Sequence, residues 1–142
     1  MRIRELTVDD YAEIVSLWDR SALPHKPKGR DSKSAFELQI KKNPNFFLGA
    51  YEEDKLVGTV FASFDYRRGW INRLAIDPKY RRSGVAQKLI AAAEKALRKK
   101  GAKIISALVE DYNVASLSLF KKCGYVEHRD VVYFSKRDSD EV

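Results

Sequence analysis

The chain has few of the residues that cross-link small proteins or carry metals. Its 142 residues include one cysteine, Cys123, which excludes an intramolecular disulfide and a cysteine-rich zinc site. The two histidines, His25 and His128, stand far apart in the sequence, so no metal is expected. The longest apolar run is only Leu89–Ala93, which predicts neither a membrane span nor a secretory leader. The default location is the cytoplasm.

The seven glycines are spaced so that two common phosphate-binding motifs cannot occur. No two glycines stand two residues apart, which excludes the G-x-G-x-x-G pattern, and none precedes a lysine, which excludes a Walker A loop. Ser83 lies outside any G-x-S-x-G sequence, which argues against hydrolase chemistry. Length and composition predict a single domain over residues 1–137 and a disordered acidic tail over 138–142.

The chain is basic, with 27 Lys and Arg residues against 20 Asp and Glu residues and a net charge of +7. Its basic clusters suit either a nucleic acid or a small polyphosphate, and each is equally consistent with a solvated surface. No helix-turn-helix, zinc-finger or RNP pattern accompanies them, which argues against a nucleic-acid partner. Only the cluster Lys79–Arg82 stands beside a glycine turn, at Gly84, and so has a context that favours an anion.

The hydrophobic periodicity predicts an α/β (α+β) fold with about four helices and six to seven strands. A surface loop is expected over 22–31, because it holds two prolines and a glycine among basic residues. The expected helices cover 11–18, from Asp31 or Ser32 to about 43, 83–100 and 114–122. The expected strands cover 2–6, an antiparallel meander of 46–51, 56–65 and 70–76, then 104–109, and one or two strands within 125–135.

The sequence from Arg81 to Ala86, Arg-Arg-Ser-Gly-Val-Ala, joins an apolar strand to the longest expected helix. Gly84 would let a phosphate approach the backbone, and Ala86 keeps the helix entry small. The free N–H groups and the positive dipole end of the helix favour an anion, and the two arginines add charge. Taken alone, the segment is equally a basic helix start and nothing more.

The chain carries Arg81-x-x-Gly84-x-Ala86 after Leu74-Ala75-Ile76-Asp77-Pro78, then Val109-Glu110-Asp111-Tyr112-Asn113, Ser116, Leu117, Leu119 and Gly124-Tyr125. The order of these motifs resembles the GNAT superfamily of N-acetyltransferases, which implies a mixed, largely antiparallel central sheet with splayed central strands. More narrowly, the chain resembles the YpeA-like branch near the ribosomal-protein acetyltransferases. The residues that carry this resemblance are Leu17-Trp18, Gly29-Arg30-Asp31, Asn43-Pro44, Val57–Val60, Arg68-Gly69-Trp70 and Lys136-Arg137. The GNAT resemblance covers nearly the whole chain.

The resemblance implies that acetyl-CoA is the cosubstrate and binds where the strands ending at Ile76 and Val109 splay apart. Main-chain groups of Leu74 and Ile76 would hold the pantetheine arm, and one N–H group near them would polarise the thioester carbonyl. Main-chain N–H groups of Arg82–Ala86 would hold the pyrophosphate. Asn113 would contact the arm or the thiol end, a role compatible with a helix N-cap. The full set implied for the cofactor is Leu74, Ala75, Ile76, Arg81, Arg82, Ser83, Gly84, Val85, Ala86, Asn113 and Phe120.

The sequence departs from the family pattern at two positions that bear on catalysis. Phe120 stands seven residues after Asn113, where many relatives carry a tyrosine that protonates the leaving thiolate. Leu108 stands where ribosomal-protein acetyltransferases tend to carry a glutamate. The general base and acid are therefore not assigned. The candidates are Glu110, Asp111 and Tyr112, then Glu52, Asp65 and Tyr133, and a surface or packing role accounts for each of them as well.

Without an evident base, an acceptor amine of low pKa is favoured. Deprotonation at pH 7 costs about 4.6 kcal/mol for a lysine amine but about 1 kcal/mol for an α-amine. Direct transfer in a ternary complex is expected, since positioning and oxyanion stabilisation can carry much of the rate. Acceptor contacts are expected from Trp18, Arg30, Asp65 and Arg68, whose arginine and carboxylate groups suit a zwitterionic or peptide-like amine.

Two alternatives to an acetyltransferase stay open from the sequence: a non-catalytic module and, as a weaker reading, a nucleic-acid-binding domain driven by the charge of +7. A non-catalytic acyl-CoA-binding module would also keep the phosphate loop and lack proton-transfer groups. A second copy of the chain, forming a homodimer, is a further candidate partner besides a small-molecule or protein amine.

Overall fold

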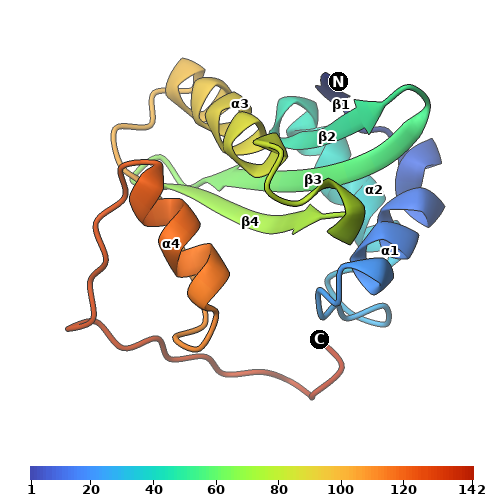
Figure 1. The fold of residues 1–142 in the computed structure, drawn as a ribbon. Helices are drawn as coiled ribbons and strands as arrows, with labels where there is room; N and C mark the ends of the chain where they lie inside the picture. Colours follow the sequence, from blue (N-terminus) through green and yellow to red (C-terminus); the bar gives the residue numbers. More distant parts are fainter.

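Alternate residues of the central strand β3 (Lys55–Phe64) face different helices. A side chain at Gly58 would meet Leu89, on helix α3 (Val85–Lys99). The next residue, Thr59, instead bonds Trp18, on helix α1 (Tyr11–Arg20). The computed structural model, which describes residues 1–142, therefore has α3 on one face of its sheet and α1 on the other (Figure 1).

The sheet has five strands in the order β1-β2-β3-β4-β5. The outer strands are β1 (Arg2–Glu5) and β5 (Ile105–Ala107), and β2 (Phe47–Glu52) and β4 (Gly69–Ile76) flank β3. All neighbours are antiparallel except β4 and β5, which are parallel. The predicted antiparallel meander is confirmed as β2-β3-β4.

All four predicted helices are present. Ser32 is the N-cap of helix α2 (Lys33–Lys42), and its side chain accepts the Ala35 N–H. Asn113 is the N-cap of α4 (Val114–Lys122), and its side chain accepts the Ser116 N–H. Short 3₁₀ turns cover Val8–Asp10, Pro44–Phe46 and Pro78–Tyr80. None of the helices is both long enough and apolar enough to cross a lipid bilayer.

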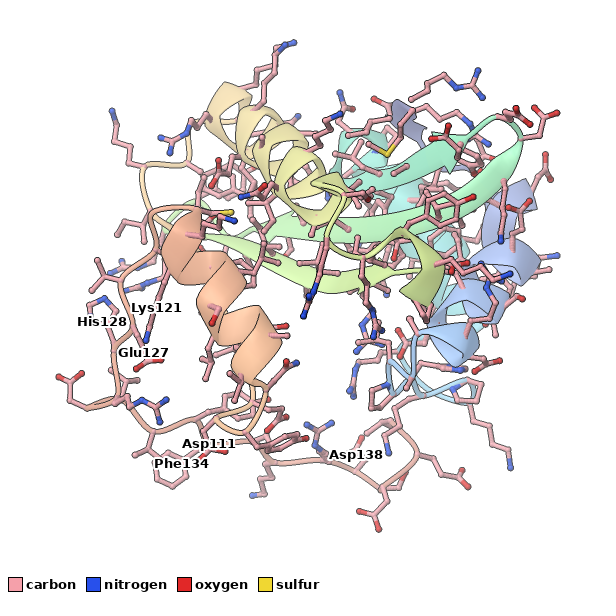
Figure 2. All side chains as sticks on the ribbon, in the orientation of Figure 1. Asp111, Lys121, Glu127, His128, Phe134 and Asp138 are labelled. Atoms are coloured by element: carbon pink, nitrogen blue, oxygen red, sulfur yellow. The ribbon has the colours of Figure 1, made fainter.

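The expectation of six to seven strands was wrong, because the segment after α4 forms no strand. The Tyr125 N–H closes α4 by bonding the Phe120 carbonyl at 2.9 Å, and no backbone–backbone hydrogen bond involves residues 126–142. Periodicity within 125–135 indicated a strand, but a strand also needs a neighbouring edge to pair with. Figure 2 shows Glu127, His128 and Phe134 on this segment, outside the sheet. The strand expected over 104–109 is likewise reduced to Ile105–Ala107.

Candidate active site

Strands β4 and β5 pair only briefly and then part. Their ladder has three positions, ending at Ile71 opposite Ala107, while β4 continues to Ile76. Asn72–Ile76 therefore have no partner strand on that side. Leu74, Ala75 and Ile76, the residues expected to hold a pantetheine arm, lie on this unpaired edge. The expected splaying of these strands is thus present in the fold.

A β-bulge lies at the point where the two strands part. From Thr59 to Phe61 strand β3 advances two residues, whereas its partner β4 advances three, from Asn72 to Ala75. The extra residue falls beside Arg73, whose φ of 52° is left-handed. Bulges bend a strand and increase its twist. The bulge therefore turns the end of β4 away from the line of β5.

The loop that follows β4 presents free backbone donors. The N–H groups of Arg82, Ser83 and Gly84 donate to no protein acceptor, and the first helical bond of α3 runs from the Lys88 N–H to the Gly84 carbonyl at 3.1 Å. The N–H groups of residues 85–87 lie in the first turn of α3, before the first helical hydrogen bond, so they have no acceptor within the helix. Gly84, at the N-cap, has no side chain that could accept from them. Arg82 and Gly84 both have left-handed φ, of 63° and 82°.

Space at Gly84 lies open on the outer side of this loop. No protein atom lies within 4 Å of the position that a Cβ would take there. The uncapped helix start, the open space and the exposed side chains of Arg81 and Arg82 together form an anion-binding arrangement. The residues expected to bind the pyrophosphate, 82–86, lie in this arrangement.

Asp77, which the sequence reasoning did not assign, holds this loop to the rest of the fold. Its carboxylate is 2% exposed and accepts the Lys79 N–H at 2.9 Å and the Arg20 Nε–H at 3.2 Å. Lys55 Nζ lies 3.5 Å from the same carboxylate. Burial alone would raise the pKa of Asp77, but the Lys79 N–H and the two cations outweigh it and lower the pKa. The Asp-Pro-Lys sequence, which is typical of a capped turn, was the available signal.

Trp18 supports the bulge from the α1 face. The Trp18 Nε1–H donates to Thr59 Oγ1 at 3.0 Å, and the Thr59 hydroxyl donates to the Arg73 carbonyl at 3.0 Å. The Arg73 guanidinium lies 5.1 Å from the centre of the Trp18 ring. Trp18 is only 2% exposed, so an acceptor molecule could reach it only after local opening.

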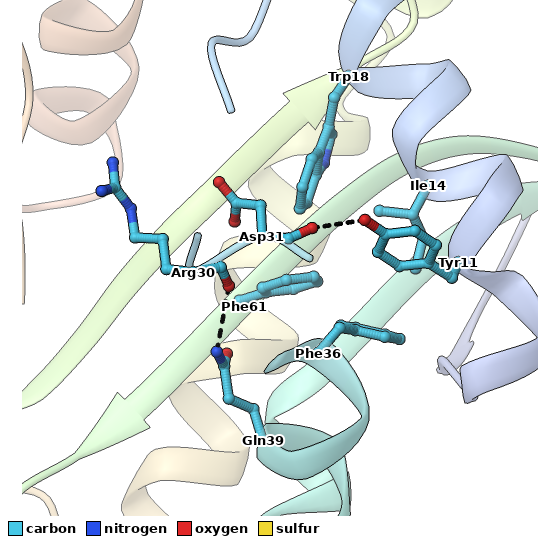
Figure 3. Close-up of a pocket in the computed structure, with 8 residues that line it drawn as sticks. All are labelled: Tyr11, Ile14, Trp18, Arg30, Asp31, Phe36, Gln39 and Phe61. Atoms are coloured by element: carbon cyan, nitrogen blue, oxygen red, sulfur yellow. Dashed lines mark hydrogen bonds between the residues drawn. The ribbon is translucent and has the colours of Figure 1, made fainter. Parts of the chain in front are cut away.

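The four residues expected to contact the acceptor fall into two groups. Trp18 and Arg30 line a pocket between α1 and α2 whose volume of about 10 Å³ matches a single water molecule (Figure 3). Asp65 and Arg68 instead form the β3–β4 turn, at the other end of β4 from Ile76, where Asp65 Oδ1 accepts the Arg68 N–H at 2.7 Å. The structure therefore does not bring the four together.

The candidate acids and bases make no organised proton relay. Glu110, Asp111 and Tyr112 lie in the turn before α4, and their side chains form no hydrogen bond within the protein. Tyr133 is exposed, and Glu52 lies 3.8 Å from the N-terminal amine at the far edge of the sheet. These positions assign no catalytic group.

Phe120 is buried on the inner side of α4 and packs edge-to-face on Tyr125, with ring centres 5.1 Å apart. The Tyr125 hydroxyl donates to Glu94 at 2.6 Å, and burial together with this bond raises the pKa of Tyr125. Tyr125 thus stays protonated and hydrogen-bonded to the Glu94 carboxylate.

Asn113 accepts the Ser116 N–H at 3.1 Å, which makes it the N-cap of α4.

Residues 6–125 match the family model described as acetyltransferase (GNAT) family. An acetyltransferase of Photorhabdus laumondii subsp. laumondii is 34% identical over 96% of this chain and 95% of its own length. An acetyltransferase of Sodalis glossinidius is 31% identical over the same shares of the two chains. The chain therefore belongs to the GNAT family of acetyltransferases.

Solved structures show the same fold at low sequence identity. The structure of AAC(6')-Iy in complex with the bisubstrate analog CoA-S-monomethyl-acetylneamine superimposes with a TM-score of 0.79, at 20% identity over 96% of this chain and 97% of that one. The PaiA N-acetyltransferase of Thermoplasma acidophilum, in complex with coenzyme A, gives a TM-score of 0.74 at 21% identity, over 85% and 86% of the two chains. The family membership and the shared fold together define this protein as a GNAT acetyltransferase.

Proposed function

We propose that this chain is a cytoplasmic N-acetyltransferase of the YpeA-like branch, which transfers an acetyl group from acetyl-CoA to a primary amine. The observation that carries the proposal is the joint placement of two features on one end of β4. The unpaired edge at Leu74–Ile76 continues directly into the loop of free N–H groups before α3. Solved neighbours with this fold hold coenzyme A or a CoA-linked analog, which supports the same donor here.

The groups on this chain suit an acyl donor that combines a thioester with a negatively charged pyrophosphate. The N–H groups around Gly84 would bind the pyrophosphate, with Arg81 and Arg82 adding positive charge. The unpaired main chain of Leu74–Ile76 would hold the pantetheine arm by strand-like hydrogen bonds, and one of its N–H groups would polarise the thioester carbonyl. Acetyl-CoA supplies an activated acyl group with a thiolate as leaving group.

Transfer is proposed to be direct. The neutral amine nitrogen attacks the carbonyl carbon, the N–C bond forms, the C–S bond breaks, the thiolate leaves with the electron pair, and the amine loses a proton to solvent. A covalent enzyme intermediate is disfavoured because Cys123 is the single thiol, and burial together with Glu94 raises its pKa. A protonated thiol is a poor nucleophile. Positioning and carbonyl polarisation then supply the rate enhancement.

Replacing Gly84 by Glu tests the donor site. The new side chain places bulk and negative charge in the open space beside the free N–H groups, so micromolar acetyl-CoA binding should be abolished in isothermal titration. Gly101→Glu is a matched control, because Gly101 also has a left-handed φ, of 106°, with no protein atom within 4 Å, and lies at the opposite end of the same helix. Both variants should lose about 1–2 kcal/mol of stability from backbone strain.

Retention of acetyl-CoA binding by Gly84→Glu, or equal loss in Gly101→Glu, would contradict the proposed site. Release of free CoA in the presence of a panel of amines then separates an enzyme from a binding module. Amines with a pKa near that of an α-amine should react fastest at pH 7, because less free energy is needed to deprotonate them.

A further inference from the structure

The loop between α1 and α2 carries three cations, Lys26, Lys28 and Arg30, and the acidic tail 138–142 lies on it. Lys26 Nζ donates to the Asp140 carbonyl at 2.6 Å, and Arg30 Nη1 donates to the main-chain oxygen of Val142, the last residue, at 2.7 Å. Lys28 Nζ lies 3.8 Å from a carboxylate oxygen of Glu141. Figure 1 shows the C end of the chain beside this loop. We call residues 26–30 the basic loop.

Close packing of main chain on main chain accompanies these polar contacts. A Cβ added at Gly29 would stand 2.5 Å from both the Glu141 carbonyl oxygen and Val142 Cα. Because φ at Gly29 is not left-handed, the backbone conformation does not require glycine there. The lack of a side chain at Gly29 instead lets the main chain of Glu141 and Val142 approach closely. The basic loop thus combines positive charge with close contact to a peptide backbone.

The basic loop is held in place by groups of the candidate active site. Asp31 is 7% exposed and accepts the Lys26 N–H at 2.8 Å. Arg73 Nη1 donates to the Pro24 carbonyl at 2.7 Å and lies 3.5 Å from Asp31 Oδ2. Arg73 is the bulge residue at which β4 parts from β5. The loop is therefore preorganised, and it stands beside the proposed acetyl-transfer site.

We propose that the basic loop is a binding site for acidic peptide segments and that the chain's own tail is its intramolecular occupant. Main-chain oxygens accept both hydrogen bonds from the loop, so peptides of other sequence can replace the tail, and the Lys28–Glu141 pair favours those with a carboxylate at that position.

Backbone order parameters of the full chain, measured by NMR relaxation, test whether the tail is docked. In the wild type at low salt the Glu141 and Val142 amides should be nearly as ordered as those of α2, with values near about 0.85. In Gly29→Ala and in Arg30→Gln they should fall below about 0.6. Lys33→Gln, which removes an exposed cation that does not touch the tail, should leave them unchanged. A disordered tail in the wild type would overturn the proposal.

Titration of the full chain with the free peptide Asp-Ser-Asp-Glu-Val tests the ligand class. The peptide should shift the amide signals of Gly29 and Arg30 and release the tail, and Arg30→Gln should weaken it by up to about fivefold. The comparison ligands are the peptide Asn-Ser-Asn-Gln-Val, which lacks the three side-chain carboxylates and should release the tail less, and inorganic phosphate. Release by phosphate as readily as by the peptide, or no release by the peptide, would refute an acidic-peptide site.

Neither readout depends on acetyl-CoA. A failure of this inference leaves the Gly84→Glu titration unaffected, and a failure of acetyl-CoA to bind leaves the tail measurements interpretable.

Discussion

A single hydroxyl, that of Thr59, connects helix α1 to the bulge in β4. It accepts the Trp18 indole N–H and donates to the Arg73 carbonyl, both at 3.0 Å, and Thr59 is fully buried. The sequence predicted a strand residue here and nothing more, because β-branched residues are common in strands. The role of Thr59 depends on partners 41 positions before it and 14 after it along the chain.

Thr59→Val should destabilise the protein by about 2–4 kcal/mol, because two buried polar groups lose their partner while the side chain keeps its shape. Thr59→Ser retains the hydroxyl and should cost only about 1 kcal/mol, for the lost methyl group. Urea unfolding at neutral pH, followed by circular dichroism, measures both values. A loss in Thr59→Ser without a loss in Thr59→Val would show that packing of the methyl group, and not the hydrogen bonds, is what Thr59 contributes.

Helix ends are the features of the elements that followed most directly from sequence. Asp31 or Ser32 was expected to cap the second helix and Asn113 to cap the fourth, and Ser32 and Asn113 do so. A cap depends on residues within one turn, so local sequence suffices to recognise it. The start of α3 at Val85, two residues later than expected, follows from the left-handed φ of Gly84.

Two substitutions at Asn113 separate its capping role from its proposed contact with acetyl-CoA. Asn113→Ala should lower the free energy of unfolding by about 1 kcal/mol, whereas Asn113→Ser keeps a capping oxygen and should change it little. If the amide contacts the cofactor, both variants weaken acetyl-CoA binding. Unfolding and titration measured on the same samples decide the matter, and normal binding by Asn113→Ser would remove Asn113 from the cofactor site.

At the scale of the whole molecule, Asp77 joins three elements. Its carboxylate contacts Arg20 from α1 and Lys55 from β3, and it stands directly after β4. Because these partners lie far apart in sequence, their convergence depends on the complete fold. The same cluster sets the position of the loop that precedes α3, which links overall stability to the proposed phosphate site.

Asp77 should make the free energy of unfolding fall as the pH is lowered. Its pKa is lower in the folded protein than the usual value of 3.8, so the stabilisation is complete above that value and is lost as pH falls through the folded pKa. Urea midpoints at pH 7, 5 and 3 should therefore fall most steeply below pH 4. Asp77→Asn should flatten this fall, while Asp54→Asn, in the exposed β2–β3 turn, should not. An unchanged profile in Asp77→Asn would assign the acid sensitivity to other carboxylates.

The sequence by itself determined the helices, their caps, the meander and the glycine turn before α3, because periodicity, capping and turn chemistry act over a few neighbouring residues. Only the tertiary structure decided that β4 carries a bulge at Arg73, that Asp77 gathers two cations, and that residues 125–135 pair with no strand. Each of these depends on groups from distant parts of the chain, whose approach is set by packing of the whole fold. The same reason separated Asp65 and Arg68 from Trp18 and Arg30, although all four had been expected in one acceptor site.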